Sequence, residues 1–282
     1  MPDTRSPSAL ILSSFVAASR IGGAAQQYVL AAHRIDPVLV PTAIFGRSPA
    51  KGARGEPTGP EAFRRMLGDI EADAVFGLLD LVITGHFSLP EQVEIAAGFV
   101  ERIRAGSVRP PVVIVDPIMG DAPKGLYVKA EVAEAIAGRL VPLADWITPN
   151  LWELGRLAGR EVRDAKGAAA AARALGKPAL VTSVPGRAGE IGLLLCEAGG
   201  GATLISHREA EQAPSGTGDL VAASFGAGLA EGLLPSAAAE RAARAAAEAV
   251  EAAQALGVAD LPLVAIAARL AAPRAAVRVE RL

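Results

Sequence analysis

Short apolar runs alternate with helix-like stretches along the first two thirds of this chain. The apolar runs cover residues 9–12, 38–45, 79–85, 112–116, 144–150 and 179–183, and helical stretches include 26–34, 61–75, 90–104 and 165–175. Strands that alternate with helices of about 10–15 residues require right-handed crossovers, which give a parallel sheet covered by helices on both faces. We therefore predict an α/β fold, a three-layer αβα sandwich with a mostly parallel central sheet.

The last third of the chain has a different pattern. Residues 191–196 and 202–205 are two short apolar runs joined by a Gly-rich turn, which predicts a hairpin at the edge of the sheet. Three helices should follow, over 217–231, 236–256 and 261–270. We find no stretch with the composition of an interdomain linker, so we predict one domain over residues 1–282.

Composition limits the partners and the cellular compartment. The formal charge of −2 gives no reason to expect binding of nucleic acid or of an anionic membrane. Cys196 is the one cysteine, which excludes an intramolecular disulfide and favours a reducing compartment. The first seven residues are polar, and the longest run of small apolar residues is too short to span a bilayer. We therefore predict a cytoplasmic protein that binds neither nucleic acid nor membrane.

Polar side chains follow the apolar runs at the same relative place. They are Ser14, Thr42, His86, Asp116, Thr148, Asn150, Thr182 and Ser183. Because the carboxyl ends of parallel strands meet at one edge of a sheet, these side chains should line a common cleft. Each of them alone is explained equally well as a helix N-cap.

The segment Ser215-Gly216-Thr217-Gly218-Asp219 directly precedes a helix of small apolar residues. Glycines let backbone N–H groups approach a ligand closely, and the start of a helix favours an anion. A carboxylate beside such a phosphate site can accept the proton of an attacking hydroxyl group. We predict that Asp219 is a general base and that Gly216, Thr217 and Gly218 form the anion hole. The alternative is that Asp219 only complements the helix dipole.

The oxygen-bearing side chains favour magnesium. Two carboxylates, Asp116 and Asp121, flank a Pro–Gly turn, and Asn150 and Glu153 lie three residues apart. Carboxylate and amide oxygens suit Mg²⁺, which keeps several waters and binds substrate phosphates. The alternative for Glu153 is capping of the helix that Asn150 begins. Together with the anion hole, this set predicts phosphoryl transfer from a nucleotide to a hydroxyl group.

At these residues the chain resembles the ribokinase-like superfamily and, within it, the pyridoxal kinases, from about residue 10 to 256. The resemblance is carried by Asp116-Pro-Ile-Met-Gly-Asp121, Gly125-Leu-Tyr-Val128, Ile147-Thr-Pro-Asn-Leu-Trp-Glu153, Val181-Thr-Ser183 and Ser215-Gly-Thr-Gly-Asp-Leu220. It implies a homodimer that phosphorylates the 5′-hydroxymethyl group of pyridoxal, with ATP as co-substrate and Mg²⁺ as cofactor.

The resemblance also implies roles for individual residues. Asp116 and Glu153 would hold the metal, and Thr148 and Thr182 would ligate a monovalent cation, K⁺ or Na⁺. The nucleotide would contact Asp116, Tyr127, Asn150, Glu153, Thr182, Ser183 and Thr217. The acceptor would contact Ser14, Thr42, His86 and Asp219. We expect Asp116 and Glu153 to act on the metal rather than on the fold.

The acceptor end departs from the family pattern at Phe15, Ser19, Gly23 and His86. Another B6 vitamer could therefore be the preferred acceptor. A hydroxymethylpyrimidine kinase of the same fold is one alternative, and a non-catalytic protein that binds vitamin B6 is another. The intact Gly216–Asp219 segment argues against the binder, because a pure binder has no use for the base.

Overall fold

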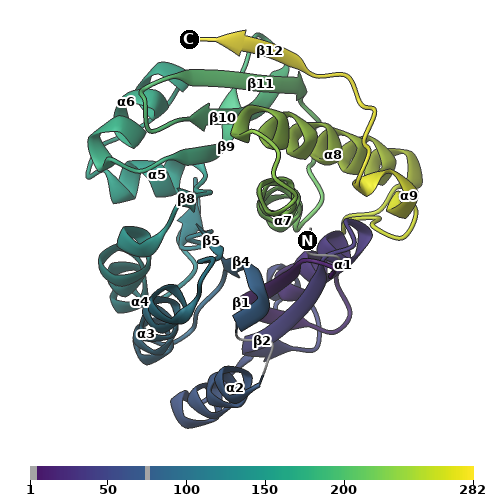
Figure 1. Ribbon diagram of the computed structural model, residues 1–282. Helices are drawn as coiled ribbons and strands as arrows, with labels where there is room; N and C mark the ends of the chain where they lie inside the picture. The colour runs from purple at the N-terminus through teal and green to yellow at the C-terminus, as the bar shows by residue number, and fades with distance from the viewer. Residues whose placement is uncertain (1–4, 74–76) are drawn as a thin grey trace.

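The computed structural model describes residues 5–73 and 77–282, and these residues form a mixed sheet with helices on both faces (Figure 1). The main sheet of this part has ten strands in the order β12-β11-β10-β9-β8-β5-β4-β1-β2-β3. Neighbours from β2 through β9 pair in parallel, whereas β3 at one end and β10, β11 and β12 at the other pair antiparallel. The predicted α/β fold is confirmed.

The strands of the main sheet are β1 Ser8–Val16, β2 Asp36–Phe45, β3 Glu56–Pro57, β4 Leu79–Thr84, β5 Val112–Val115, β8 Trp146–Ile147, β9 Ala179–Pro185, β10 Glu190–Cys196, β11 Ala202–Arg208 and β12 Arg278–Arg281. A separate two-stranded ribbon pairs β6 Gly120–Asp121 with β7 Gly125–Leu126. This ribbon follows β5 and lies beside the predicted site.

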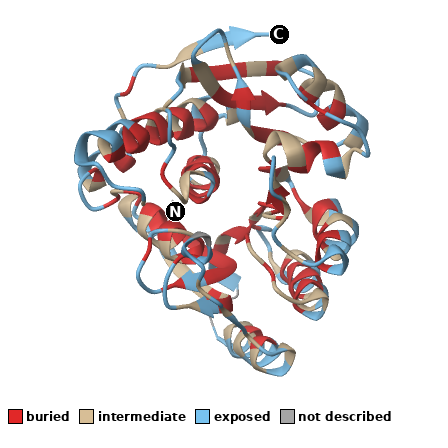
Figure 2. Cartoon of the chain, turned by 180° about the vertical axis from the view of Figure 1, so that it is seen from behind, coloured by how far each residue is buried: buried red, intermediate tan, exposed pale blue. Residues whose placement is uncertain are grey.

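Side-chain alternation in the strands produces two cores, one on each face. Leu10 and Leu12 of β1 belong to the core that is covered by α2 Pro60–Ala72, α3 Pro90–Gly106, α4 Ala130–Ala135, α5 Leu151–Leu157 and α6 Ala165–Leu175. Ala9 and Ile11 belong to the opposite core, covered by α1 Gly23–Ala32, α7 Thr217–Ala230, α8 Pro235–Leu256 and α9 Ala267–Leu270. Figure 2 shows buried residues on the sheet and on the inner sides of these helices. The layers follow from the period of two in each strand.

Helix α7 lies unusually close to the sheet. Its glycine at position 226 leaves no room for a side chain, because a Cβ there would lie 3.0 Å from side-chain atoms of both Ile114 and Leu81. Close packing of this buried helix on β4 and β5 fixes its first turn near the carboxyl ends of those strands. The small residues of α7 thus position the predicted anion hole.

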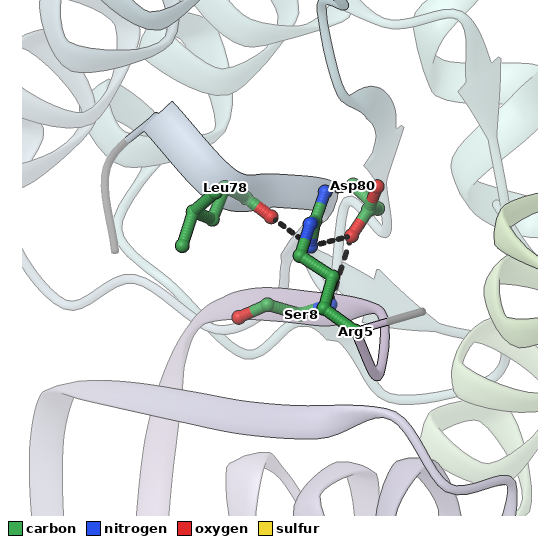
Figure 3. Close-up of polar contacts among 4 residues, drawn as sticks. All are labelled: Arg5, Ser8, Leu78 and Asp80. Atoms are coloured by element: carbon green, nitrogen blue, oxygen red, sulfur yellow. Dashed lines mark hydrogen bonds and ion pairs between the residues drawn. The ribbon is translucent and has the colours of Figure 1, made fainter. Parts of the chain in front are cut away.

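The first described residues are tied to β4 (Figure 3). The guanidinium of Arg5 donates two hydrogen bonds to the carboxylate of Asp80, at 2.8 and 3.0 Å, and a third to the carbonyl oxygen of Leu78. The backbone N–H of Ser8 donates to the same carboxylate. Asp80 therefore joins the start of β1 to its neighbour β4.

Four expectations need correction. The predicted hairpin is not at the edge of the sheet, because β12 pairs with β11 beyond it. The segment 46–60, whose Gly- and Pro-rich composition predicts a long loop, contains a helical turn, Pro49–Lys51, and β3. The helix predicted over 261–270 is limited to α9, and the strand predicted over 144–150 to β8. Of the helix predicted over 61–75, the last two residues lie outside the described ones.

Several elements have no sequence prediction: α4, the β6–β7 ribbon and β12. Strand β12 has the sequence Arg-Val-Glu-Arg, and charged side chains are what an exposed edge strand tolerates. It lacks the apolar alternation that identifies an inner strand. Across the described ranges 5–73 and 77–282, none of the helices is both long and apolar enough to cross a membrane.

Candidate active site

The predicted site residues lie at the carboxyl ends of the parallel strands and at the start of α7. Electrostatic interaction couples Asp116 to both Glu153 and Asp219, so these three buried carboxylates share one region. Thr182, Ser183 and Thr217 line a neighbouring cavity. Ser14, Thr42 and His86 lie at the ends of β1, β2 and β4. The site thus has two ends, which we name after their predicted roles: the phosphoryl-transfer end around Asp116 and Asp219, and the acceptor end around Thr42 and His86.

Asp219 is a buried carboxylate with one bonded and one free oxygen. Its Oδ2 accepts a hydrogen bond of 2.8 Å from the backbone N–H of Gly22, whereas Oδ1 has no partner among the described residues. Burial raises the pKa of Asp219 to about 6, against the opposing effect of the Gly22 hydrogen bond. The carboxylate is therefore ionised at neutral pH, held in one orientation, and able to accept a proton on Oδ1.

The turn before Asp219 exposes the start of α7. Gly216 has φ 96°, and a Cβ there would lie 2.4 Å from the carbonyl oxygen of Arg20. Only glycine fits this position. Gly218 is exposed with open space around it, and Gly216 as N-cap provides no side-chain cap to the helix. The hydroxyl of Thr217 donates to the carbonyl oxygen of Pro214. The free N–H groups of this first turn can therefore receive an anion.

Asp116 has the most perturbed environment of the three carboxylates. Burial raises the pKa of Asp116 well above its usual range, and the charges of Glu153 and Asp219 raise it further. Three carboxylates in a buried region repel one another unless a cation is present. A divalent cation would relieve this repulsion and return Asp116 to its ionised form.

Glu153 is part of the fold as well as of the site. Its Oε1 accepts hydrogen bonds from the backbone N–H groups of Met119 and Gly120, and its Oε2 accepts one from Asn150. Asn150 in turn caps α5 by accepting from the N–H of Glu153 and donates to the carbonyl oxygen of Gly120. The capping interpretation is confirmed, and the expectation that Glu153 acts on the metal alone needs correction. Because both oxygens accept hydrogen bonds from the backbone, Glu153 would reach a metal most easily through water.

The available donors fit a magnesium ion. Among the described residues, Asp116 is the one of these three carboxylates without an anchoring backbone contact, and its interaction with the buried hydroxyl of Thr148 opposes the rise in its pKa. Among the described residues no group of three His, Cys, Asp or Glu side chains could enclose a metal. Mg²⁺ does not need such a cage, because it is bound by one or two carboxylates together with substrate phosphates and water. The protein atoms present match that type of site and not a zinc site.

A cavity of ≈ 310 Å³ lies between the β9–β10–β11 end of the sheet and helices α7 and α8. Thr182, Ser183 and Thr217 supply polar atoms, and its apolar wall is formed by Ile191, Leu193, Ala213, Val221, Ala246 and Val250. Ser183 has φ 60° beside a register shift in the β9–β10 pairing, which leaves it exposed. An apolar slot with a few polar groups at the anion hole is suited to a nucleotide.

Four of the seven residues that were predicted to bind the nucleotide do not line this cavity: the carboxylates Asp116 and Glu153, and the side chains of Asn150 and Tyr127. Asn150 lies at the α5 cap, as described above. Tyr127 lies half exposed just after β7, and burial together with a hydrogen bond to Asp121 raises the pKa of its hydroxyl group. Both lie near the carboxylates rather than near the apolar slot.

The acceptor end is built from side chains of three segments. Ser14 and Thr42 are buried, and the Thr42 hydroxyl donates to the carbonyl oxygen of His86 at 2.5 Å. Burial lowers the pKa of His86 to about 4, so its imidazole is neutral at pH 7. The ring contacts Ser88 Oγ at 3.1 Å and meets Phe45 edge-on, with centroids 6.3 Å apart. This wall offers an uncharged, aromatic surface with hydrogen-bonding groups.

Two residues of the site were not predicted. Gly22 donates a hydrogen bond to Asp219, and Gln92 holds the acceptor end through four hydrogen bonds. The sequence gives Gly22 no signal beyond a Gly–Gly pair, because its contact with Asp219 joins residues 197 positions apart. Gln92 resembles any polar residue in a first helical turn.

Comparisons with known proteins agree with this geometry. The family model described as phosphomethylpyrimidine kinase matches residues 29–264. The chain is 36% identical over 230 residues to a pyridoxine/pyridoxal/pyridoxamine kinase from Bordetella avium, covering 78% of this chain and 77% of the relative.

Solved structures share the fold over nearly the whole length. Pyridoxal kinase from Entamoeba histolytica has a TM-score of 0.90 at 22% identity, covering 99% of this chain and 100% of that one. Pyridoxal kinase from Leishmania donovani in complex with ADP has a TM-score of 0.89 at 26% identity, covering 98% and 99%. The fold and the site thus define a ribokinase-like kinase. Within that class, the chain belongs to the pyridoxal kinase family.

Proposed function

We propose that this chain, as one kinase domain over residues 1–282, transfers the γ-phosphoryl group of ATP to the 5′-hydroxymethyl group of pyridoxal or another B6 vitamer. The observation that carries the proposal is the geometry of Asp219. One oxygen of this buried carboxylate is fixed by Gly22, and the other is free beside the open first turn of α7. The relative from Bordetella avium supports the choice of vitamin B6.

The base and the anion hole act together in the transfer. The hydroxyl oxygen of the acceptor attacks the γ-phosphorus, and its proton passes to Oδ1 of Asp219. The bond between the γ-phosphorus and the bridging oxygen breaks, and ADP leaves with the electron pair. The N–H groups at Gly216, Thr217 and Gly218 stabilise the charge on the phosphoryl oxygens during the transfer.

Asp116 would hold Mg²⁺ directly and Glu153 through water. When bound, the ion would neutralise phosphate charge and help to align the phosphoryl group. Thr148 and Thr182 are the candidate ligands of a monovalent cation, K⁺ or Na⁺. The buried position of the Thr148 hydroxyl beside the carboxylate of Asp116 supports this assignment.

Release of ADP across four acceptors tests the proposal: pyridoxal, pyridoxine, pyridoxamine and hydroxymethylpyrimidine. The proposal predicts the largest kcat/KM with a B6 vitamer. Because the matching family model is described as phosphomethylpyrimidine kinase, hydroxymethylpyrimidine is the second candidate acceptor. Preference for that substrate would support the alternative, and tight binding of pyridoxal without ADP release would support a non-catalytic binder.

We further propose a homodimer in the cytoplasm. Phe15 and Ile44 are exposed apolar residues that lie opposite each other on β1 and β2, and such a pair is suited to a subunit contact. The one cysteine, Cys196, is a free buried thiol, in keeping with a reducing compartment. Sedimentation of the purified protein tests the dimer.

A further inference from the structure

A buried glutamine lies directly behind the acceptor end of the site. Gln92 is in the first turn of α3 and has no exposed surface. Its Oε1 accepts hydrogen bonds from the backbone N–H groups of Ser88 (3.0 Å) and Leu89 (3.2 Å). Its Nε2 donates to the carbonyl oxygens of Thr42 and Thr58, both at 2.7 Å. Every hydrogen-bonding position of the amide is thereby used.

These four contacts join β2 and the neighbouring Thr58 to the turn after β4, although β2 and β4 do not pair with each other in the sheet. Thr42 belongs to β2 and Ser88 follows β4, and β1 lies between these two strands. Thr58 closes the segment that leaves β2 after Phe45, and its own N–H donates to the Thr42 carbonyl oxygen. Together with the bond from the Thr42 hydroxyl to His86 and the ring contact between Phe45 and His86, Gln92 connects the two walls of the acceptor end.

We propose that Gln92 is a positioning residue for the acceptor: it holds Thr42 and His86 at the spacing that the acceptor ring requires, without touching acceptor or ATP. The inference rests on the proposed function. A side chain without exposed surface cannot contact a substrate, so its influence must pass through the residues it holds. Because small displacements of a binding wall are costly, loss of Gln92 should weaken acceptor binding far more than nucleotide binding.

The test compares Gln92→Met with Val93→Ala. Methionine has a similar volume and none of the four hydrogen bonds. Val93 is the next residue of the same helix and is fully buried in the apolar core, so its truncation destabilises α3 without removing a hydrogen bond of Gln92. Steady-state KM is measured for pyridoxal and for ATP, together with the melting temperature of each variant.

We expect Gln92→Met to raise the KM for pyridoxal about tenfold or more, with the KM for ATP within about twofold of wild type. Val93→Ala should lower the melting temperature and leave both KM values nearly unchanged. Gln92→Glu keeps the two accepted bonds but places a carboxylate oxygen against the carbonyl oxygens of Thr42 and Thr58, so it should raise the KM for pyridoxal at least as much; it also replaces Gln92→Met if that variant does not fold.

Three outcomes overturn the inference. The pyridoxal KM of Gln92→Met, or of Gln92→Glu where that variant replaces it, could stay within about twofold of wild type. This result would contradict the positioning role of Gln92 and leave the proposed function intact. An equal rise in Val93→Ala reduces that role to general stability. A wild-type protein that releases no ADP with any of the four acceptors overturns the proposed function together with this inference.

Discussion

The two ends of the site are built in different ways. At the phosphoryl-transfer end, backbone groups do most of the work: the Gly216–Gly218 turn presents N–H groups, and backbone N–H groups orient Asp219 and Glu153. At the acceptor end, side chains from separate segments form the wall, and the amide of Gln92 connects them. The groups predicted to act on the phosphoryl group are thus held by the rigid ends of helices and strands, whereas the choice of acceptor depends on side chains.

This contrast predicts that changes at one end alter kcat and changes at the other alter the acceptor KM. The largest effect is expected for Asp219→Asn, which keeps the size of the side chain but removes the proton acceptor. Loss of a positioned base costs about 10²–10⁴-fold in kcat. Because the anion contacts are backbone groups, the Kd for ATP should change little. Near-normal turnover, measured as ADP release, would remove Asp219 from the mechanism.

The pH dependence of kcat/KM tests the phosphoryl-transfer end separately from the acceptor end. The pKa of Asp219 is raised by burial to about 6, and the base acts only when ionised. Activity should therefore be lost as the pH falls through about 6, by roughly tenfold per pH unit below it. The small residual activity of Asp219→Asn is the control: the limb due to Asp219 should vanish, and any acidic limb that remains belongs to Asp116 or Glu153, whose pKa values burial also raises. His86, with its pKa lowered to about 4, should add no limb near neutrality.

Glu153→Gln should have a mixed effect, because Glu153 belongs to both fold and site. An amide NH₂ must face at least one of the backbone N–H groups that the carboxylate now binds, and a buried donor left unpaired costs about 1–3 kcal/mol. We expect a melting temperature several degrees lower and a higher Mg²⁺ concentration for half-maximal rate.

Asp164→Ala is the matched control for Glu153→Gln, because Asp164 caps α6 through the N–H of Gly167. It should lower stability without changing the Mg²⁺ requirement. An unchanged requirement in Glu153→Gln as well would limit Glu153 to its capping function.

The smallest predicted effect concerns the segment 46–60, which we expect, together with 208–214, to cover the site when both substrates are bound. An exposed ion pair of 3.1 Å between Lys51 and Asp260 holds the tip of this segment. The backbone of Asp260 in turn forms an isolated β-bridge with Ser215, which precedes the predicted anion hole. Exposed pairs contribute at most about 1 kcal/mol, so the tip should open readily while β3 and Thr58 stay bonded to β2.

Trypsin measures this opening. Cleavage after Lys51 or Arg54 should slow several-fold when a non-hydrolysable ATP analogue and pyridoxal are added. Cleavage after Arg160, exposed in the turn that follows α5, is the internal control and should not respond. If both sites respond equally, the substrates stabilise the whole chain and the segment is no cover.

The contrast between the two ends also explains what the sequence could predict. Local patterns identified the sheet, the helix after Asp219 and the polar residues at strand ends. The spacing of apolar residues, the glycine turns and the ends of strands can each be recognised from a few consecutive residues. The Asn150–Glu153 cap was visible for the same reason.

Contacts between distant segments could not be predicted in this way. Gln92 reaches Thr42 across 50 positions, and a glutamine in a first helical turn is most often a surface residue. Gly22 binds Asp219 through a backbone group, which any residue type possesses. Strand β12 is charged and short, so only its pairing with β11 defines it. The acceptor end was harder to predict because it consists mainly of such contacts.

The central claim is that ATP gives its terminal phosphoryl group to the hydroxymethyl group of a B6 vitamer at this site. Phosphorus-31 NMR of a complete reaction with pyridoxal and ATP tests it directly. The account predicts a single phosphate monoester on the 5′ carbon, formed in equal amount with ADP. Formation of ADP with inorganic phosphate and no ester, or an ester on the phenolic oxygen, would contradict it.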